Sequence, residues 1–226
     1  MRLALFVPLA LLAATPALAQ TSRDYPVDGF RAVELRGPQR VTVRVGGAFA
    51  VRASGTAAAL ADLDIRRDGD RLVIRRTRQG WLDKRDIAQV EVTLPAIERA
   101  SVSGSGDMNV DRVNTPRFAA AVAGSGDLRI GSLATRDAAL SVSGSGDLWV
   151  SGRADAAQMS VTGSGDLHGD QLTLTRAQAS VTGSGDLRAQ VHGNAQVSLI
   201  GSGDIDLGAG ARCTISKMGS GSVRCG

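Results

Sequence analysis

Gly104-Ser105-Gly106-Asp107 is the first of six copies of one tetrapeptide in this chain. The other copies begin at Gly124, Gly144, Gly163, Gly183 and Gly201, and a seventh at Gly219 reads Gly-Ser-Gly-Ser. Successive copies start 18 to 20 residues apart. A constant turn sequence at a nearly fixed period is typical of a protein built from stacked coils. The repeat therefore predicts an all-β fold, a β-helix or solenoid with coils of about 18–20 residues.

Apolar residues recur at fixed positions on both sides of the tetrapeptide. Two residues before it stand Val102, Val122, Val142, Val161, Val181 and Leu199. Directly after it stand Met108, Leu128, Leu148, Leu167, Leu187, Ile205 and Val223. Even spacing around a turn predicts two strands whose inner faces meet. Such a narrow interior has no room for large rings, which fits 43% hydrophobic residues with only 3% aromatic ones.

The segment before the repeats has a less regular strand pattern. Residues 41–45 and 90–94 alternate apolar and polar side chains, as half-buried strands do. Residues 57–61 are mostly alanine and read as a short helix capped by Thr56. Residues 77–86 read as an exposed loop that carries Trp81.

This pattern suggests how the chain is divided. We expect an N-terminal extension over residues 20–29 and a single β-helical domain over residues 30–226. Its irregular β part, residues 30–100, would continue the stack that the repeats form over residues 101–226.

Residues 1–19 have the features of a secretory signal peptide. Arg2 gives a positive start, an apolar run follows, and Ala17-Leu18-Ala19 matches the cleavage pattern. The run is too short for a membrane span, and no later stretch approaches 18 consecutive apolar residues. No cysteine follows the cleavage site. We predict a periplasmic or secreted protein without a transmembrane segment or a lipid anchor.

Without Arg2 the mature chain carries 25 basic and 22 acidic residues. The basic excess is densest between Arg66 and Arg85, where aspartates are interleaved, so a solvated strand pair is the first interpretation. Contact with acidic polysaccharide or anionic lipid is the alternative. The export signal and the few aromatic residues argue against a nucleic-acid partner.

The chain has two cysteines, Cys213 and Cys225. In an oxidising compartment they predict one disulfide. Such a closure contributes roughly 2 to 3 kcal/mol on the chain-entropy model. No histidine or further cysteine stands nearby to complete a four-ligand metal site.

The repeated aspartates allow two interpretations. They are Asp107, Asp127, Asp147, Asp166, Asp186 and Asp204. Each carboxylate can accept hydrogen bonds from the backbone of its own turn, which makes the column a structural ladder. Alternatively the column binds cations, as calcium-binding repeats of nine residues do. Because the period here is twice that length, we favour the structural ladder and predict neither a metal nor a cofactor.

The residues two positions after each aspartate should point outward. They are Asn109, Arg129, Trp149, His168, Arg188, Asp206 and Arg224. Their variety favours an ordinary solvated face. Arg129, Trp149, His168 and Arg188 fall on adjacent coils, however, and form a candidate sugar-binding strip with Trp149 as the stacking platform.

The repeated Gly-Ser-Gly-Asp-Leu corner, together with the strands at residues 41–43, 68–74 and 90–95, resembles the bacterial auto-transporter adhesin head domain, the head GIN family. The resemblance covers roughly residues 30–223. It implies an exported β-helical domain, considered adhesin-like, with no assigned biochemical activity and no catalytic residues to transfer. This chain departs from the repeat pattern at Ser222, which replaces the last aspartate, and in its terminal cysteine pair.

These features predict a non-catalytic exported protein that binds envelope polysaccharide or another protein. A polysaccharide lyase on a β-helix is the enzymatic alternative, but it needs a local cluster of carboxylates, a cation and a base. The sequence has an even ladder of like carboxylates instead, and its two histidines, His168 and His192, have no evident nucleophile partner. A scaffolding role, alone or within an oligomer, is the third interpretation.

Overall fold

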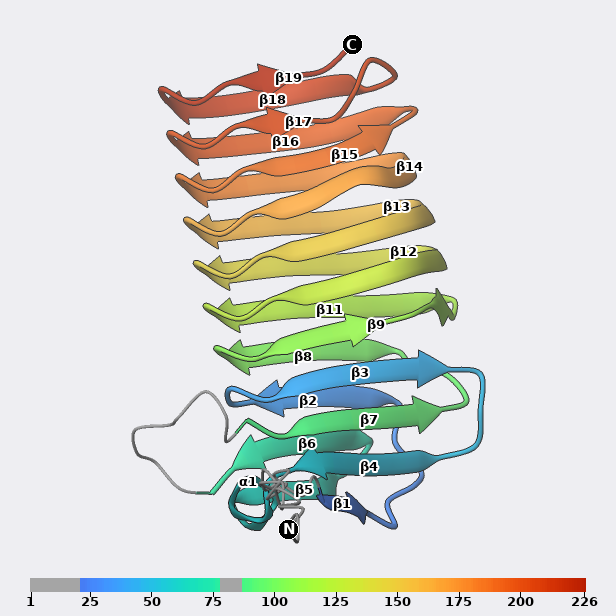
Figure 1. Ribbon diagram of the computed structural model, residues 1–226. Coiled ribbons are helices and arrows are strands. Elements are labelled where there is room, and N and C mark those ends of the chain that lie inside the picture. Colours follow the sequence, from blue (N-terminus) through green and yellow to red (C-terminus); the bar gives the residue numbers. More distant parts are fainter. Residues whose placement is uncertain (1–20, 78–86) are drawn as a thin grey trace, which may run out of the picture.

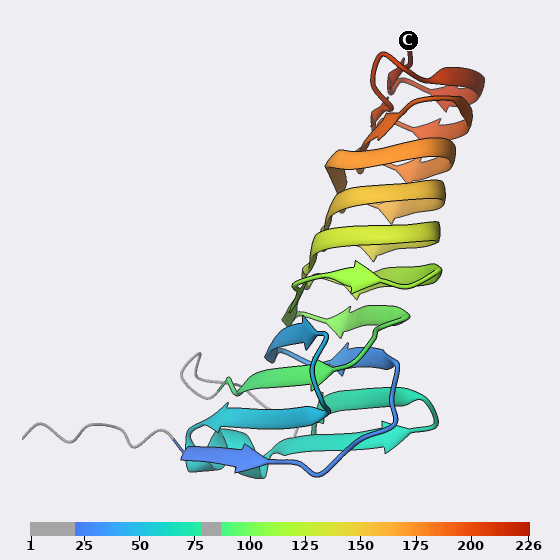
Figure 2. The ribbon, with the colours of Figure 1, turned by 90° about the vertical axis from the view of Figure 1, so that its right-hand side faces the viewer.

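The computed structural model describes residues 21–77 and 87–226 of the 226-residue chain. The predicted signal peptide lies outside the described residues, as does most of the predicted loop with Trp81. Figure 1 and Figure 2 show a rod of stacked β coils that widens into a curled sheet near the N-terminus. The predicted all-β solenoid is confirmed.

The described chain forms 19 strands and one short helix. The N-terminal part contains β1 (Thr21–Asp24), β2 (Ala32–Arg36), β3 (Arg40–Val45), β4 (Ala50–Gly55), α1 (Ala57–Ala61), β5 (Leu63–Asp68), β6 (Arg71–Arg76) and β7 (Gln89–Leu94). The stack begins with β8 (Arg99–Gly104), β9 (Asp107–Val110), β10 (Val113–Asn114), β11 (Arg117–Gly124), β12 (Leu128–Gly144) and β13 (Leu148–Gly163). It ends with β14 (Leu167–Gly183), β15 (Leu187–Val191), β16 (Asn194–Gly201), β17 (Ile205–Asp206), β18 (Arg212–Gly219) and β19 (Val223–Arg224).

The corners lie directly above one another along one edge of the rod. The first glycine of each tetrapeptide pairs in parallel register with the first glycine of the next, from Gly104 to Gly219. In the middle of the rod one strand follows almost the whole coil, as in the 17-residue β12, and only the corner interrupts it. Each sequence repeat therefore corresponds to one step along the axis of the rod.

Both glycines of the corner are required by the stacking, as Gly144 and Gly146 illustrate. Gly144 has φ +121°, which side-chain-bearing residues rarely adopt. A Cβ on Gly146 would overlap the backbone carbonyl oxygen of Gly126 in the preceding coil. The same close approach lets the Gly124 carbonyl oxygen accept two hydrogen bonds, from the N–H groups of Ser145 (2.9 Å) and Gly146 (3.0 Å).

The predicted apolar columns form the core. The valine column before the corner and the leucine column after it are buried as far as the last coil. At the C-terminal end Lys217 pairs in register with Leu199, so a lysine stands where the column would otherwise continue. Lys217 is exposed.

The N-terminal part continues the stack, but its layers are not in sequence order. β2 and β3 pair in parallel with β8 and β9, and β6 and β7 pair in parallel with β2 and β3 on the other side. The carbonyl oxygen of Gly37 accepts the N–H of Gly106 at 2.9 Å, so Gly37 continues the corner column. β1, β4 and β5 then pair antiparallel and close this end of the rod.

The short helix and the basic strands agree with the sequence analysis. The Thr56 hydroxyl accepts the N–H of Ala59 at 3.1 Å and caps α1. In the basic segment Arg75 pairs with Asp64 at 2.6 Å, and Arg76 pairs with Asp62 at 3.2 Å. These arginines therefore belong to a hairpin with its own counter-charges. The strand β1 was not predicted from the sequence.

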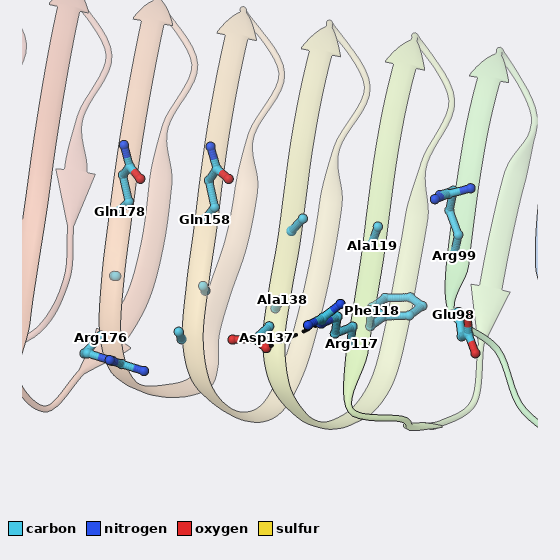
Figure 3. A pocket seen from close by; sticks show the side chains of 14 residues that line it. Glu98, Arg99, Arg117, Phe118, Ala119, Asp137, Ala138, Gln158, Arg176 and Gln178 are labelled. Atoms are coloured by element: carbon cyan, nitrogen blue, oxygen red, sulfur yellow. Dashed lines mark ion pairs between the residues drawn. The ribbon is translucent and has the colours of Figure 1, made fainter.

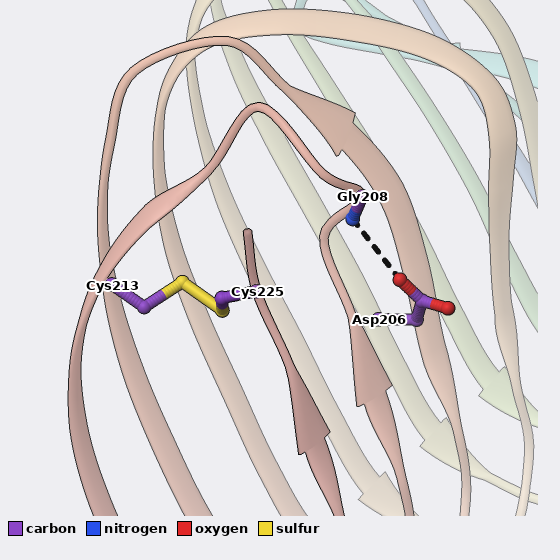
Figure 4. Close-up of a disulfide and its surroundings, with 4 residues drawn as sticks. All are labelled: Asp206, Gly208, Cys213 and Cys225. Carbon is purple, nitrogen blue, oxygen red and sulfur yellow. Dashed lines mark hydrogen bonds between the residues drawn. A yellow bond between two sulfur atoms is a disulfide. The ribbon is translucent and has the colours of Figure 1, made fainter.

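The disulfide joins the last two strands of the rod to each other (Figure 4). Cys213 lies in β18, and Cys225 directly follows β19, with their Cα atoms 6.2 Å apart. Nearby, Asp206 accepts the N–H of Gly208 at 3.0 Å and shapes the turn after β17. The predicted pairing of the two cysteines is confirmed.

Among the described residues, no helix has both the length and the apolar character needed to cross a membrane.

Candidate functional site

The aspartate column is a ladder bonded to backbone from one coil to the next. The Oδ1 atom of Asp147 accepts the N–H of Asp166 at 2.8 Å, and Oδ1 of Asp166 accepts the N–H of Asp186 at 2.8 Å. Asp127 and Asp186 make the same bond to the following coil. The prediction that each carboxylate caps its own turn is therefore wrong in detail, because the coil spacing brings the next corner's N–H groups within reach.

The ladder ends at Ser222, which replaces the seventh aspartate. Its N–H and its hydroxyl both donate to Oδ1 of Asp204, at 2.7 and 2.9 Å. These bonds favour the ionised carboxylate and hold the pKa of Asp204 below its ordinary value. The serine thus continues the pattern of donors at the last coil without adding another negative charge.

The four predicted strip residues lie in one outward column on adjacent coils. Arg129 pairs with Trp149, Trp149 with His168, and His168 with Arg188 in parallel register. The rings of Trp149 and His168 stack with centroids 5.0 Å apart, and the guanidinium of Arg129 lies 4.0 Å from the Trp149 ring centroid. The predicted adjacency of these four residues is confirmed, and their role in sugar binding stays a prediction.

The stacking does not favour Trp149 as a sugar platform. Arg129 lies on the coil before Trp149 and His168 on the coil after it, so each face of the indole ring has a neighbour. The strip's arginines are also paired: Arg129 lies 3.5 Å from Asp127, and Arg188 lies 3.0 Å from Asp186. The strip therefore presents ring edges and compensated charges.

A shallow groove on another face of the rod offers a better concave surface (Figure 3). Its volume is about 630 Å³. Its floor consists of the nearly buried residues Phe118, Ala138, Ala157 and Ala177. We call it the alanine groove. One row beside it consists of Arg99, Ala119, Ala139, Gln158 and Gln178, and the other of Arg117, Asp137, Ala156 and Arg176.

The hollow runs along one inward column of the coils. That column holds Phe118 at one coil and alanine at the next four, as far as Ala195. The outward rows beside this column include the short side chains of Ala119, Ala139 and Ala156, which leave the strand surface between the rows open. A second hollow, of about 680 Å³, shares Arg176 and Ala177 with the first and extends to Thr214. With coils about 4.8 Å apart, the combined groove is roughly 29 Å long.

The charges beside the groove are only partly compensated. Glu98 pairs with Arg31 at 2.8 Å, and Asp137 lies 3.9 Å from Arg117. Within residues 21–77 and 87–226, no carboxylate forms an ion pair with the other three groove arginines, Arg99, Arg176 and Arg212. The groove therefore has an excess of available positive charge.

Sequence reasoning missed this groove. The signal was present as alanine at the position six residues before each corner glycine, in Ala138, Ala157, Ala177 and Ala195. Alanine is an ordinary core residue, however, and only the stacking shows that these four positions adjoin along one line.

A comparison with protein-family models identifies the chain's relatives. Residues 29–225 match the family described as "Putative auto-transporter adhesin, head GIN domain". The chain belongs to the head GIN domain family. The resemblance inferred from the repeated corner is thereby confirmed, over almost the same residues.

Crystal structures of similar shape include proteins described as adhesins. One described as a "putative adhesin" from Bacteroides fragilis NCTC 9343 has a TM-score of 0.83 and 19% identity, covering 93% of this head GIN domain chain and 98% of its own. A second "putative adhesin", from Parabacteroides merdae ATCC 43184, has a TM-score of 0.73 and 14% identity, with coverages of 91% and 95%.

A third similar structure carries a different description. It is a "putative lipid binding protein" from Parabacteroides distasonis ATCC 8503, with a TM-score of 0.69, 17% identity and coverages of 91% and 96%. At such identities the likeness shows a shared fold and no shared ligand. No curated protein matches the sequence.

Proposed function

We propose that this head GIN domain is a non-catalytic, adhesin-like binding protein of the bacterial cell envelope that holds an acidic polysaccharide in the alanine groove. Membership in an adhesin family supports an extracellular or envelope location. The predicted signal peptide agrees with export, and the ligand class is argued from the groove itself.

The excess positive charge along an extended hollow carries the proposal. Arg99 lies in one row beside the groove, Arg176 and Arg212 lie in the other, and none of the three has a carboxylate partner within the described residues. Guanidinium groups bind carboxylates with two parallel hydrogen bonds. The amides of Gln158 and Gln178 project from the same face and can donate to and accept from hydroxyl groups. A linear uronic-acid polymer has both kinds of group at regular intervals.

A binding role without catalysis accords with the arrangement of the carboxylates. In the ladder, Asp127, Asp147, Asp166 and Asp186 each accept a backbone N–H of the following coil. Beside the groove, Asp137 lies near Arg117, and Glu98 bonds Arg31. These bonds and ion pairs give the acidic groups structural partners, as expected for a scaffold. The lyase interpretation predicts ultraviolet absorbance of unsaturated sugars after incubation with uronic-acid polymers, and we expect none.

Binding of polygalacturonate to the immobilised protein tests the proposal, with dextran as the neutral polymer. Ala119→Trp places an indole beside the groove, whereas Ala123→Trp makes the same change four residues along β11 and outside it. We expect Ala119→Trp to weaken binding about tenfold, about 1.4 kcal/mol, and Ala123→Trp to leave it unchanged. Arg176→Gln should weaken binding and reduce its salt dependence.

The Trp149→Ala variant distinguishes polysaccharide binding in the alanine groove from binding at the strip. If Trp149→Ala binds polygalacturonate like the parent protein and Ala119→Trp loses binding, the result supports a binding site in the alanine groove. Loss in Trp149→Ala alone would assign the ligand to Arg129, Trp149, His168 and Arg188 instead. Equal binding of dextran and polygalacturonate would contradict the proposed ligand class, and so would the absence of binding to both polymers.

A further inference from the structure

Two carboxylates and one imidazole converge near the middle of the rod, away from the alanine groove. Asp147, Asp166 and His168 each offer a ligand atom, and these atoms lie within 4.8 Å of one another. Asp147 belongs to one coil, and Asp166 and His168 belong to the next. The side chains of Asp166 and His168 are 33% and 21% exposed, so the cluster is accessible from solvent.

The cluster lies between two positions of the aspartate ladder that have an arginine partner. Asp127 and Asp186 each pair with the arginine two residues later in the sequence. At Asp147 that position is Trp149, and at Asp166 it is His168, whose Nε2 lies 3.9 Å from Oδ2 of Asp166. Two carboxylates at the coil spacing repel by roughly 0.9 kcal/mol in bulk water, and by several times that at an effective dielectric constant near 20. A cation between them would remove this repulsion.

The ladder also fixes the orientation of both carboxylates. Oδ1 of Asp147 and Oδ1 of Asp166 each accept a backbone N–H from the following coil at 2.8 Å. This arrangement holds the carboxylate planes in place and leaves the Oδ2 atoms for another partner. Hydrogen bonds of this kind to ligating groups are typical of protein metal sites.

We propose that Asp147, Asp166 and His168 bind a divalent transition metal ion of the zinc, nickel and copper class. Imidazole nitrogen suits these ions, whereas calcium and magnesium prefer ligand sets made entirely of oxygen. Metal–ligand bonds near 2.1 Å keep ligand atoms within about 4.2 Å of one another, so small side-chain rotations close the site. Three protein ligands leave at least one position for water or an external ligand.

The neighbouring tryptophan provides a direct signal of binding. The Trp149 ring stacks on His168 with centroids 5.0 Å apart, and Cu²⁺ bound at the imidazole will quench its fluorescence. The chain has one other tryptophan, Trp81. Trp81→Phe therefore serves as the background in which Trp149 is the only indole.

Titration of Cu²⁺ into the Trp81→Phe protein, followed by fluorescence, tests the site, and calorimetry with Zn²⁺ measures binding independently of the indole. We expect saturable quenching with a stoichiometry of one. His168→Gln and Asp147→Asn should raise the half-quenching concentration at least tenfold. Asp147→Asn keeps a side-chain oxygen that can accept the Asp166 N–H, so the ladder is preserved.

Two matched variants control for other ligands. His192→Gln removes the other histidine, and Asp186→Asn changes a ladder carboxylate that has an arginine partner. Both should bind Cu²⁺ and Zn²⁺ like the parent protein, and all variants should melt at the parent temperature without metal. Undiminished quenching in His168→Gln, loss of binding in His192→Gln, or no Zn²⁺ heat at millimolar concentration would each overturn the proposal.

Discussion

The repeat stack and the N-terminal sheet of this head GIN domain contain the same kind of parallel layer, but they assemble it differently. In the stack each coil adds one layer in sequence order, and every corner glycine pairs with the next. In the N-terminal part the β2–β3 layer lies between β6–β7 and β8–β9, and antiparallel strands close the end. Gly37 is in the corner column without the rest of the tetrapeptide.

The difference shows what the tetrapeptide is for. Where identical coils stack, the backbones approach so closely at the corner that no side chain fits, and the aspartates can bond the next coil. Where layers are unique, side-chain ion pairs stabilise the strands instead, as between Glu34 and the arginines Arg36 and Arg71. Both regions have backbone ladders and share one apolar core; the corner adds close backbone contact in the stack, and partly buried ion pairs add to the N-terminal sheet.

A methyl group at a stacked corner should have the largest effect. In Gly146→Ala the new Cβ overlaps the Gly126 carbonyl oxygen, and neither backbone can move without shifting a whole coil. We expect more than about 3 kcal/mol of destabilisation in chemical denaturation. Gly69→Ala, in the N-terminal hairpin, has φ +63° and open space around it, and should cost only about 1 kcal/mol. Equal effects at the two glycines would contradict the close-packed corner.

Loss of the disulfide should act locally. Replacing Cys213 and Cys225 together by serine should reduce the stability of the last coils by roughly 2 to 3 kcal/mol. Because each coil of a solenoid contacts only its neighbours, hydrogen exchange should quicken in β16 and β18 and stay the same in β3 and β6. Faster exchange throughout the rod would mean that the two regions unfold as one unit.

A charge change should matter more in the N-terminal sheet than on the stack surface. The side chain of Glu34 is 11% exposed and accepts hydrogen bonds from Arg36 at 2.6 Å and from Arg71 at 3.4 Å. Since both arginines are about half exposed and screened by water, we expect Glu34→Gln to cost only about 1 to 2 kcal/mol. Asp155→Asn, at an exposed stack position, should change the melting temperature little. A Glu34→Gln protein as stable as the parent protein would contradict the role of side-chain ion pairs in this region.

The smallest effect concerns two carboxyls whose pKa is lowered for different reasons. The guanidinium of Arg52 lowers the pKa of Asp24 in the N-terminal sheet, and the N–H and hydroxyl of Ser222 lower the pKa of Asp204 in the stack. A lowered folded-state pKa means that the stabilisation is present above pH 3.8 and is lost as the pH falls through the folded value. Salt of about 1 M should raise the pKa of Asp24 toward its ordinary value and move that of Asp204 less, measured by NMR titration. Equal salt sensitivity would contradict the distinction.

The sequence predicted the stack well because its information is repeated. The corner spacing, the valine and leucine columns, the outward strip from Arg129 to Arg188 and the disulfide all followed from local pattern. The order of the N-terminal layers did not, since residues 32–45 and 71–94 have similar strand patterns and only long-range pairing places one layer between two others. The alanine groove and the cluster of Asp147, Asp166 and His168 were not predicted, because alanine is an ordinary core residue and the aspartates were interpreted as a structural ladder.

Distances between spin labels on the corner serines test most directly whether the corners form one straight column. Ser105, Ser184, Ser202 and Ser220 are exposed, and the native cysteines are joined to each other, so cysteine labels can be placed at chosen pairs. Pulsed electron resonance should give separations of roughly 19, 24 and 29 Å from Ser105 to Ser184, Ser202 and Ser220, rising by about 4.8 Å per coil. Separations that do not increase evenly with the number of intervening coils would contradict the account.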